Sequence, residues 1–404
     1  MKRTAQLSLA GQWRAVARRV GLGALLMAWA CCAYAEPIDD AVSALRREDY
    51  ATARQMLEPL AAQGDGRADF WLGMMHYEGW GTHKDLQAAI RLWVEGAQRG
   101  DGMAQAQLGG LYLAGKQVPR DVEQGIRWTR LAAEQGIALA ASNLAVLYAN
   151  GTGVQRDEVQ ATIWLSRAAR GGHVPSIVEM AYRLFNGVGV RRDIGLAYAH
   201  AMTASEHGSV RAQRYAGESL RRGLGTVRDQ QAALRWMRKA AESGDTLAMD
   251  DLADMLERGQ GTPPDVEAAL KWYTAAAERG NAPSAVTLGI HYQGGHGVPV
   301  DMATAARWYR RAAELGSTNG QIDLGHMYKN ARGVAFDPLE AAFWYSLAIP
   351  KMEPGELRTK LESNRDEMVA RLSRAQRGDL ERRLAAWRAQ RPIDCGGLRE
   401  HVAP

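Results

Sequence analysis

The sequence predicts an all-α protein, an α-solenoid of about eight stacked helix-turn-helix repeats with a helical cap at each end. Three observations support this fold class: a glycine recurs every 36 residues, an aspartate follows it 21 residues later, and a tryptophan recurs in the same register. The glycines are Gly64, Gly100, Gly136, Gly172, Gly208, Gly244, Gly280 and Gly316. A fixed period of this length is typical of repeats that bury their apolar faces on their neighbours.

The aspartate and the tryptophan each have an expected structural role. An aspartate at the start of a helix is a good N-cap, because its carboxylate accepts hydrogen bonds from the first free backbone N–H groups. The aspartates are Asp85, Asp121, Asp157, Asp193, Asp229, Asp265, Asp301 and Asp337. The tryptophan is expected to be a large wedge that only stacking can bury. The tryptophans are Trp128, Trp164, Trp236, Trp272, Trp308 and Trp344, while Leu92 and His200 occupy the two remaining slots.

The second copy shows how one repeat is built. Residues 103–114 are expected to form a first helix, because Ala104, Leu108 and Tyr112 share one face. A loop then leads to Asp121, and a second helix follows as far as Gln135. Small residues recur 4 and 25 positions after each marker glycine, so neighbouring helices are expected to approach closely there.

The repeats divide the chain into four parts. We expect a signal peptide over residues 1–35, an N-terminal helical cap over 36–63, the repeat array over 64–349, and a C-terminal helical cap with a loose tail over 350–404. The N-terminal cap is expected to contain helices over 39–47 and 50–63. The C-terminal cap is expected to contain helices over 356–370 and 379–390, with Trp387 packed against the end of the array.

The first 35 residues have the features of an export signal. A basic segment precedes the apolar run VGLGALLMAWA, and Ala33, Tyr34 and Ala35 supply a small–x–small cleavage pattern. Cleavage after Ala35 predicts a periplasmic or secreted protein with no membrane span left after cleavage. Two alternatives stay open: an uncleaved anchor, and a lipoprotein modified at Cys31 or Cys32.

The charge and cysteine content limit the kinds of partner and crosslink that we expect for this protein. Residues 1–35 carry five basic and no acidic residues, so they account for the whole formal net charge of +5. The rest of the chain is neutral and offers no electrostatic basis for binding nucleic acid or an anionic membrane. After cleavage only Cys395 remains, so no internal disulfide is expected. Cys395 is expected to be a free thiol or to form a disulfide between two chains. The sequence does not indicate the oligomeric state.

No pattern in the sequence indicates catalysis, a cofactor or a metal. The motifs S-x-x-K, G-x-S-x-G and H-E-x-x-H are absent. His291 and His296 form the nearest histidine pair, and core or loop placement is favoured over metal binding because zinc needs three or four converging ligands. A calcium site at Asp250, Asp251 and Asp254 is disfavoured too, since ligands on one helix do not converge. We therefore predict no enzyme activity and no cofactor.

The repeat resembles a known family. It combines a helix of type A-x-x-x-L-G-x-x-Y, a G-x-G-V loop, the capping aspartate and a W-x-x-x-A-A helix. The residues quoted are Ala104, Leu108, Gly109, Tyr112, Gly151, Gly153, Val154, Asp157, Trp164, Ala168 and Ala169. This pattern is similar to the Sel1-like repeat, a relative of the tetratricopeptide repeat, over about residues 64–349. The resemblance implies a right-handed α-solenoid whose first helices line a concave face. Departures from the pattern are His200, Gln117 and Ala331.

The variable positions of the first helices are the candidate binding residues. They fall 6, 7, 10, 13 and 14 residues after the marker glycine and form an aromatic N-terminal half and a charged C-terminal half. The candidates are Phe70, Trp71, Met74, Tyr77, Tyr182, Phe185, Arg214, Arg221, Asp250 and Asp254, with Val178, Glu218, Arg222, Asp251 and Glu257 beside them. Alternatively, Phe70 and Trp71 pack against the N-terminal helices and the charges pair among themselves.

The resemblance also implies a function, because members of the family act as adaptors in membrane and envelope complexes. The leading hypothesis is therefore a non-enzymatic scaffold of the bacterial cell envelope that binds a partner protein in the concave groove. The alternative is binding of peptidoglycan fragments, polysaccharide or β-lactam-like ligands. A hydrolase is a third hypothesis, for which the sequence provides no nucleophile constellation.

Overall fold

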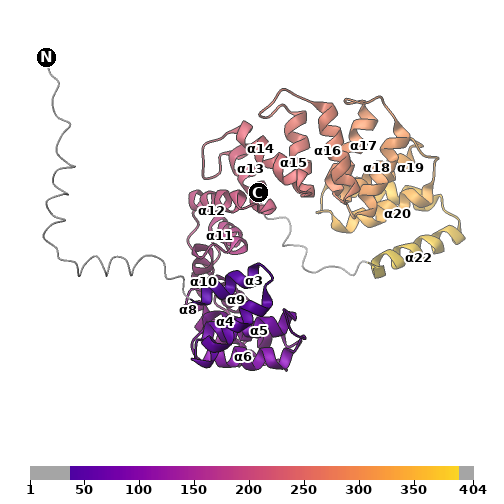
Figure 1. The fold of residues 1–404 in the computed structure, drawn as a ribbon. Helices are drawn as coiled ribbons and strands as arrows, with labels where there is room; N and C mark the ends of the chain where they lie inside the picture. Colours follow the sequence, from indigo (N-terminus) through magenta and orange to yellow (C-terminus); the bar gives the residue numbers. More distant parts are fainter. Residues whose placement is uncertain (1–36, 391–404) are drawn as a thin grey trace, which may run out of the picture. The chain divides into compact units, whose positions relative to one another are not determined.

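The computed structural model describes residues 37–390, and this part of the chain is helical throughout, with 20 α-helices, one short 3₁₀ helix and no strand. The expected signal peptide, the tail from Arg391 and Cys395 lie outside the described residues. The chain divides into two compact units that meet at residues 171 and 172. Figure 1 shows each unit as a stack of helices that follow one another in chain order.

The first unit contains the N-terminal cap and three repeats. Its helices are α3 (Pro37–Arg46), α4 (Tyr50–Ala62), α5 (Gly66–Glu78), α6 (Leu86–Gln98), α7 (Gly102–Ala114), α8 (Val122–Glu134), α9 (Ala138–Asn150) and α10 (Glu158–Arg170). Each pair from α5 onward is a helical hairpin, and each hairpin packs against the next. The two helices expected before the first repeat are therefore present.

The second unit contains five repeats and the C-terminal cap. Its repeats are α11 (Val174–Asn186), α12 (Ile194–Glu206), α13 (Val210–Arg222), α14 (Gln230–Glu242), α15 (Thr246–Glu257), α16 (Val266–Glu278), α17 (Ala282–Gly294), α18 (Met302–Glu314), α19 (Thr318–Lys329) and α20 (Pro338–Ala348). A 3₁₀ helix, η1 (Ile349–Lys351), leads to the cap helices α21 (Glu356–Ala370) and α22 (Arg374–Gln390). The Trp387 ring packs edge-on against the rings of Phe343 and Trp344, which confirms its expected place at the end of the array.

Local chemistry sets the helix boundaries. All eight capping aspartates accept a hydrogen bond from a backbone N–H in the first turn of the second helix, as expected. For example, Asp85 Oδ1 lies 2.9 Å from the Ala88 nitrogen. Most first helices end at a left-handed glycine, which costs less there than any residue with a Cβ atom. The exception is the last repeat, where Ala331 adopts φ +50°.

This exception leads to a stability prediction. Replacing Ala331 with glycine should raise the free energy of unfolding by about 0.5–1 kcal/mol, because glycine adopts the left-handed conformation without strain. Replacing Ala199, which is exposed within α12, with glycine should lower it by about 1 kcal/mol. Urea titration followed by circular dichroism measures both changes. The strain argument fails if Ala331→Gly is also destabilising.

The core differs from the expectation in one respect. Of the six repeat tryptophans, only Trp164 and Trp344 are buried, at 8% and 4% exposure, and the other four are half-buried. The deeply buried side chain is the one that follows the tryptophan slot. These residues are Trp93, Thr129, Leu165, Ala201, Met237, Tyr273, Tyr309 and Tyr345, and none is more than 5% exposed. Several of them face a glycine of the first helix, as Trp93 faces Gly73 and Tyr345 faces Gly325.

Small residues permit this packing. All the small residues 4 and 25 positions after the marker glycines are buried, as expected. A further small residue, 9 positions after the marker, faces the deeply buried side chain directly. A Cβ atom on Gly73 would collide with the Trp93 ring, and one on Gly289 would collide with the Tyr309 ring. The helices therefore approach closely wherever a large side chain crosses between them.

Candidate functional site

We refer to the first helices of the repeats in each unit as the first-helix layer. In the first unit α5 contacts α7 and α7 contacts α9, and in the second unit α17 contacts α19. These direct contacts between first helices are expected where that layer is the inner side of a stack. The variable positions predicted to bind a partner belong to this layer, in α5, α11, α13 and α15.

The four aromatic and apolar candidates of the first unit are largely taken up by packing. Phe70 is 6% exposed, so its expected place on the surface is wrong. Its carbonyl oxygen accepts a hydrogen bond of 3.2 Å from the Trp93 indole, and its ring packs edge-on against Trp71. Trp71 also packs against the cluster made by the N-terminal cap. Met74 and Tyr77 are half-buried and pack against the cluster that contains Phe70 and Trp93. The alternative that these aromatics pack against the N-terminal helices therefore describes Trp71, whereas Phe70 packs with residues of α6 and α7.

Tyr182 and Phe185 have a different environment. Both are half-buried on α11, and both line a pocket between α11, α12 and α13 with a free volume of about 30 Å³. The lining is mostly apolar and comprises Ala181, Tyr182, Phe185, Asn186, Ile194, Ala197, Tyr198, Ala201, Tyr215, Glu218, Ser219 and Leu224. A volume of this size exceeds the roughly 10–15 Å³ that one water molecule needs. The pocket can therefore accept a small apolar group.

Tyr215 lines this pocket but is not among the binding residues predicted from the sequence. Tyr215 lies seven residues after its marker glycine, Gly208, which is the same offset as Trp71 after Gly64. This shared offset would have been enough to identify Tyr215 as a candidate from the sequence. Tyr198 and Ala201 come from the second helix, α12, so a rule based on first helices alone does not find them.

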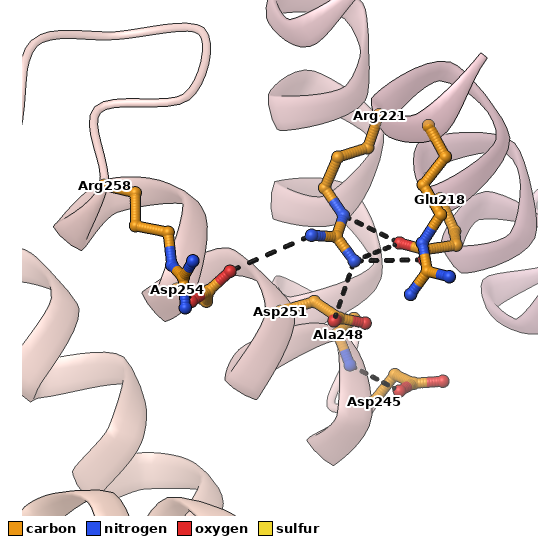
Figure 2. Close-up of polar contacts among 8 residues, drawn as sticks. Glu218, Arg221, Asp245, Ala248, Asp251, Asp254 and Arg258 are labelled. Carbon is orange, nitrogen blue, oxygen red and sulfur yellow. Dashed lines mark hydrogen bonds and ion pairs between the residues drawn. The ribbon is translucent and has the colours of Figure 1, made fainter. Parts of the chain in front are cut away.

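The charged candidates meet beside this pocket, between α13 and α15. Figure 2 shows the Arg221 side chain directed from α13 toward the carboxylates of α15. Its guanidinium lies 2.8 Å from Glu218, 3.8 Å from Asp254 and 4.0 Å from Asp251. Burial lowers the pKa of Arg221, but the three carboxylates outweigh it and the pKa is raised overall. Arg221 is therefore a fixed positive charge that holds the two helices' carboxylates together.

The other predicted charges form separate contacts in the same layer. Arg214 lies 3.4 Å from Asp245, the N-cap of α15, and Asp250 accepts a hydrogen bond of 2.5 Å from the Ser284 hydroxyl. Burial, and then the charge of Glu218, raise the pKa of Asp251 to about 6. Burial also raises the pKa of Asp250. The predicted charges thus pair largely among themselves, as the alternative stated, but they do so on a partly exposed surface.

The histidine and aspartate groups considered as metal ligands have other contacts. His291 is 3% exposed, its Nδ1 lies 2.7 Å from the His296 carbonyl oxygen, and its Nε2 lies 3.4 Å from Glu257. Asp251 and Asp254 face Arg221. Within residues 37–390 no three histidine, cysteine, aspartate or glutamate side chains are grouped as a metal site requires. The arrangement at α11, α13 and α15 is suited to recognition through an apolar pocket and adjoining charges.

Comparison with known protein families identifies the family to which the chain belongs. The model of the Sel1 repeat matches eight consecutive segments, residues 66–101, 102–137, 138–173, 174–209, 210–245, 246–281, 282–317 and 318–349. The chain belongs to the Sel1 repeat family. Proteins of this family are generally scaffolds for protein–protein interaction, and this coarse function applies to the present Sel1 repeat protein.

Solved structures support the same fold. A Sel1 repeat protein from Oxalobacter formigenes is 28% identical, with a TM-score of 0.60, over 82% of this chain and 94% of that chain. A protective antigen present in uropathogenic Escherichia coli strains is 24% identical, with a TM-score of 0.54, over 84% of this chain and 87% of that chain. The predicted α-solenoid of eight helix-turn-helix repeats is thus confirmed. No curated protein shows a significant sequence match.

Among the helices between residues 37 and 390, none combines the length and the apolar character needed to cross a bilayer. The export signal over residues 1–35 lies outside this range and stays a prediction.

Proposed function

We propose that this Sel1 repeat protein is a non-enzymatic scaffold of the bacterial cell envelope that binds a partner protein on its first-helix layer. The observation that carries the proposal is the juxtaposition, on α11, α13 and α15, of an aromatic-lined pocket with a cluster of charged side chains. Aromatic side chains beside a charged rim are the typical composition of an interaction hot spot.

The envelope location rests on the N-terminal sequence. Basic residues, a short apolar run and a small–x–small pattern before Glu36 support export by a cleavable signal. Expressing the full chain with a C-terminal tag and fractionating the cells tests this part of the proposal. A mature N-terminus at Glu36 in the periplasmic fraction supports it, and an uncleaved chain in the cytoplasmic fraction contradicts it.

The binding function is tested by comparing variants in a pull-down from envelope extract, with bound proteins quantified by mass spectrometry. The double variant Tyr182→Ala and Phe185→Ala should lose a captured partner by a factor of about 10 or more, since hot-spot aromatics cost at least 2 kcal/mol on truncation. The matched control is Leu196→Ala, which removes an exposed apolar side chain from α12 in the same repeat. Equal capture by both variants, or no partner for the unmodified chain, would contradict the proposal.

A further inference from the structure

The fourth repeat lacks the side chain that fills the hairpin core elsewhere. Each repeat pairs a small residue of the first helix with a side chain that lies 20 residues later on the second helix. The pairs are Gly73 and Trp93, Gly109 and Thr129, Ala145 and Leu165, Ala181 and Ala201, Gly217 and Met237, Ala253 and Tyr273, Gly289 and Tyr309, and Gly325 and Tyr345. The fourth pair is the one in which both members are alanine.

The pocket lies where this pair leaves space. Ala181 and Ala201 both line it, together with Ala197 and the aromatic rings of Tyr182, Phe185, Tyr198 and Tyr215. In the next repeat the Met237 side chain occupies the corresponding place, where it packs against Gly217 and is fully buried. The pocket therefore adjoins the place where the fourth repeat lacks a large core side chain.

Two arginines lie against aromatic rings of the pocket, while Glu218, the carboxylate in its lining, is paired with Arg221 and Arg222. The Arg192 guanidinium lies 5.5 Å from the centre of the Phe185 ring, and the Arg211 guanidinium lies 5.5 Å from the centre of the Tyr215 ring. Arg192 also donates to the Phe185 carbonyl oxygen and Arg211 donates to the Tyr215 hydroxyl. Neither arginine forms an ion pair within residues 37–390. Both are exposed, on rings that line the pocket.

We infer that this pocket receives the methyl end of one aliphatic side chain, such as that of leucine, from a partner segment in which acidic residues flank it. The inference rests on the proposed function and names the chemistry of the partner. The aliphatic side chain replaces the core side chain that Ala201 does not supply, and it buries the apolar walls. The flanking carboxylates pair with Arg192 and Arg211, whose planar guanidinium groups suit carboxylates in two-point contacts.

Fluorescence polarisation with labelled nine-residue peptides tests the inference. The probe is a peptide with a central leucine between two acidic residues on each side, in a Gly-Ser context. One control peptide replaces the leucine with glycine, and another replaces the acidic residues with lysine. We expect the acidic leucine peptide to bind at least about 10-fold more tightly than either control. Absence of its binding up to about 1 mM, or equal binding of the three peptides, would overturn the inference.

A variant that fills the pocket provides the second arm. Ala201→Leu reproduces the combination of Ala145 and Leu165 found in the third repeat, so it should fold with an unchanged or higher melting temperature. It should weaken binding of the acidic leucine peptide about 10-fold or more. Ala199→Leu adds the same side chain two residues away at an exposed position of α12 and should leave binding unchanged. Equal affinity of the two variants would overturn the inference.

A third arm is independent of how Ala201→Leu folds. The double variant Arg192→Gln and Arg211→Gln removes two exposed charges and their contacts with Phe185 and Tyr215, and leaves the pocket-lining side chains in place. It should remove the preference for acidic over neutral flanking residues and keep the preference for leucine over glycine. An unchanged preference for acidic flanks contradicts the assignment of these arginines. Competition by N-acetylmuramoyl dipeptide for the peptide site would also overturn the inference, because it would identify the pocket as a cell-wall ligand site.

The outcomes distinguish a failure of this inference from a failure of the proposed function. If envelope extract yields a partner that Ala201→Leu binds as well as the unmodified chain, the inference fails and the scaffold function stands. If no partner is captured but the peptide selectivity is observed, the proposed function fails and the chemistry of the pocket stands.

Discussion

Replacing Trp93 with alanine is expected to lower the free energy of unfolding by about 3–5 kcal/mol, the usual cost of removing a buried tryptophan. Trp93 is fully buried in the first repeat, fits against Gly73 and donates a hydrogen bond of 3.2 Å to the Phe70 carbonyl oxygen. Truncation leaves a cavity between α5 and α6 and removes the indole hydrogen bond. Urea unfolding followed by circular dichroism measures the change, which should be confined to the transition of residues 37–171.

The control for this prediction is the preceding residue. Leu92 occupies the tryptophan slot of the first repeat and is only half-buried. Leu92→Ala should therefore cost about 1 kcal/mol, since it returns less apolar area to water and creates little cavity. If Leu92→Ala costs as much as Trp93→Ala, the residue in the tryptophan slot and not its successor is the main wedge.

Replacing Gly225 with alanine is expected to lower the free energy of unfolding by about 2–4 kcal/mol. Gly225 adopts φ +71°, and a Cβ atom there would collide with the carbonyl oxygen of Ile194, the first residue of α12 in the preceding repeat. The left-handed conformation costs about 1 kcal/mol for alanine, and relief of the collision requires the two repeats to separate slightly, which costs about 1–3 kcal/mol more.

A second glycine separates the conformational cost from the cost of relieving the collision. Gly208 adopts φ +81°, and a Cβ atom there would have no neighbour within 4 Å. Gly208→Ala should therefore carry only the conformational cost of about 1 kcal/mol. Thermal and urea unfolding of both variants measure the difference. Equal destabilisation would show that the loop glycine of the fifth repeat acts as a turn residue alone and does not hold neighbouring repeats together.

The helix boundaries could be predicted from the sequence because the interactions that set them are local. Asp85 and the seven equivalent aspartates cap helices through backbone N–H groups two or three residues away. The glycines that end helices satisfy a backbone requirement of their own residue. Ala331 follows the same rule, since it stands in a glycine slot and adopts the left-handed conformation that the slot imposes.

The candidate site could be predicted only in outline. A constant period indicated that Tyr182, Arg221 and Asp254 belong to the same layer, and all three are found beside the pocket or in the adjoining charge cluster. The period could not indicate how deep each side chain lies. Phe70 is buried because the wedge of its own repeat is Trp93, whereas Tyr182 lines a pocket because the wedge of its repeat is Ala201.

The sequence by itself therefore determined the class of the protein, the number and length of its repeats, and the residues at which the repeat helices begin and end, whereas the last cap helix begins at Arg374 and not at the expected residue 379. Those features depend on hydrogen bonds within a few residues and on the periodic return of the same apolar face. The tertiary structure alone decided which position forms the core wedge, where a repeat leaves a pocket, and which carboxylates Arg221 holds. These depend on side chains that are 20 or more residues apart and meet only after the hairpins have packed, where the presence or absence of a few carbon atoms decides whether space is filled.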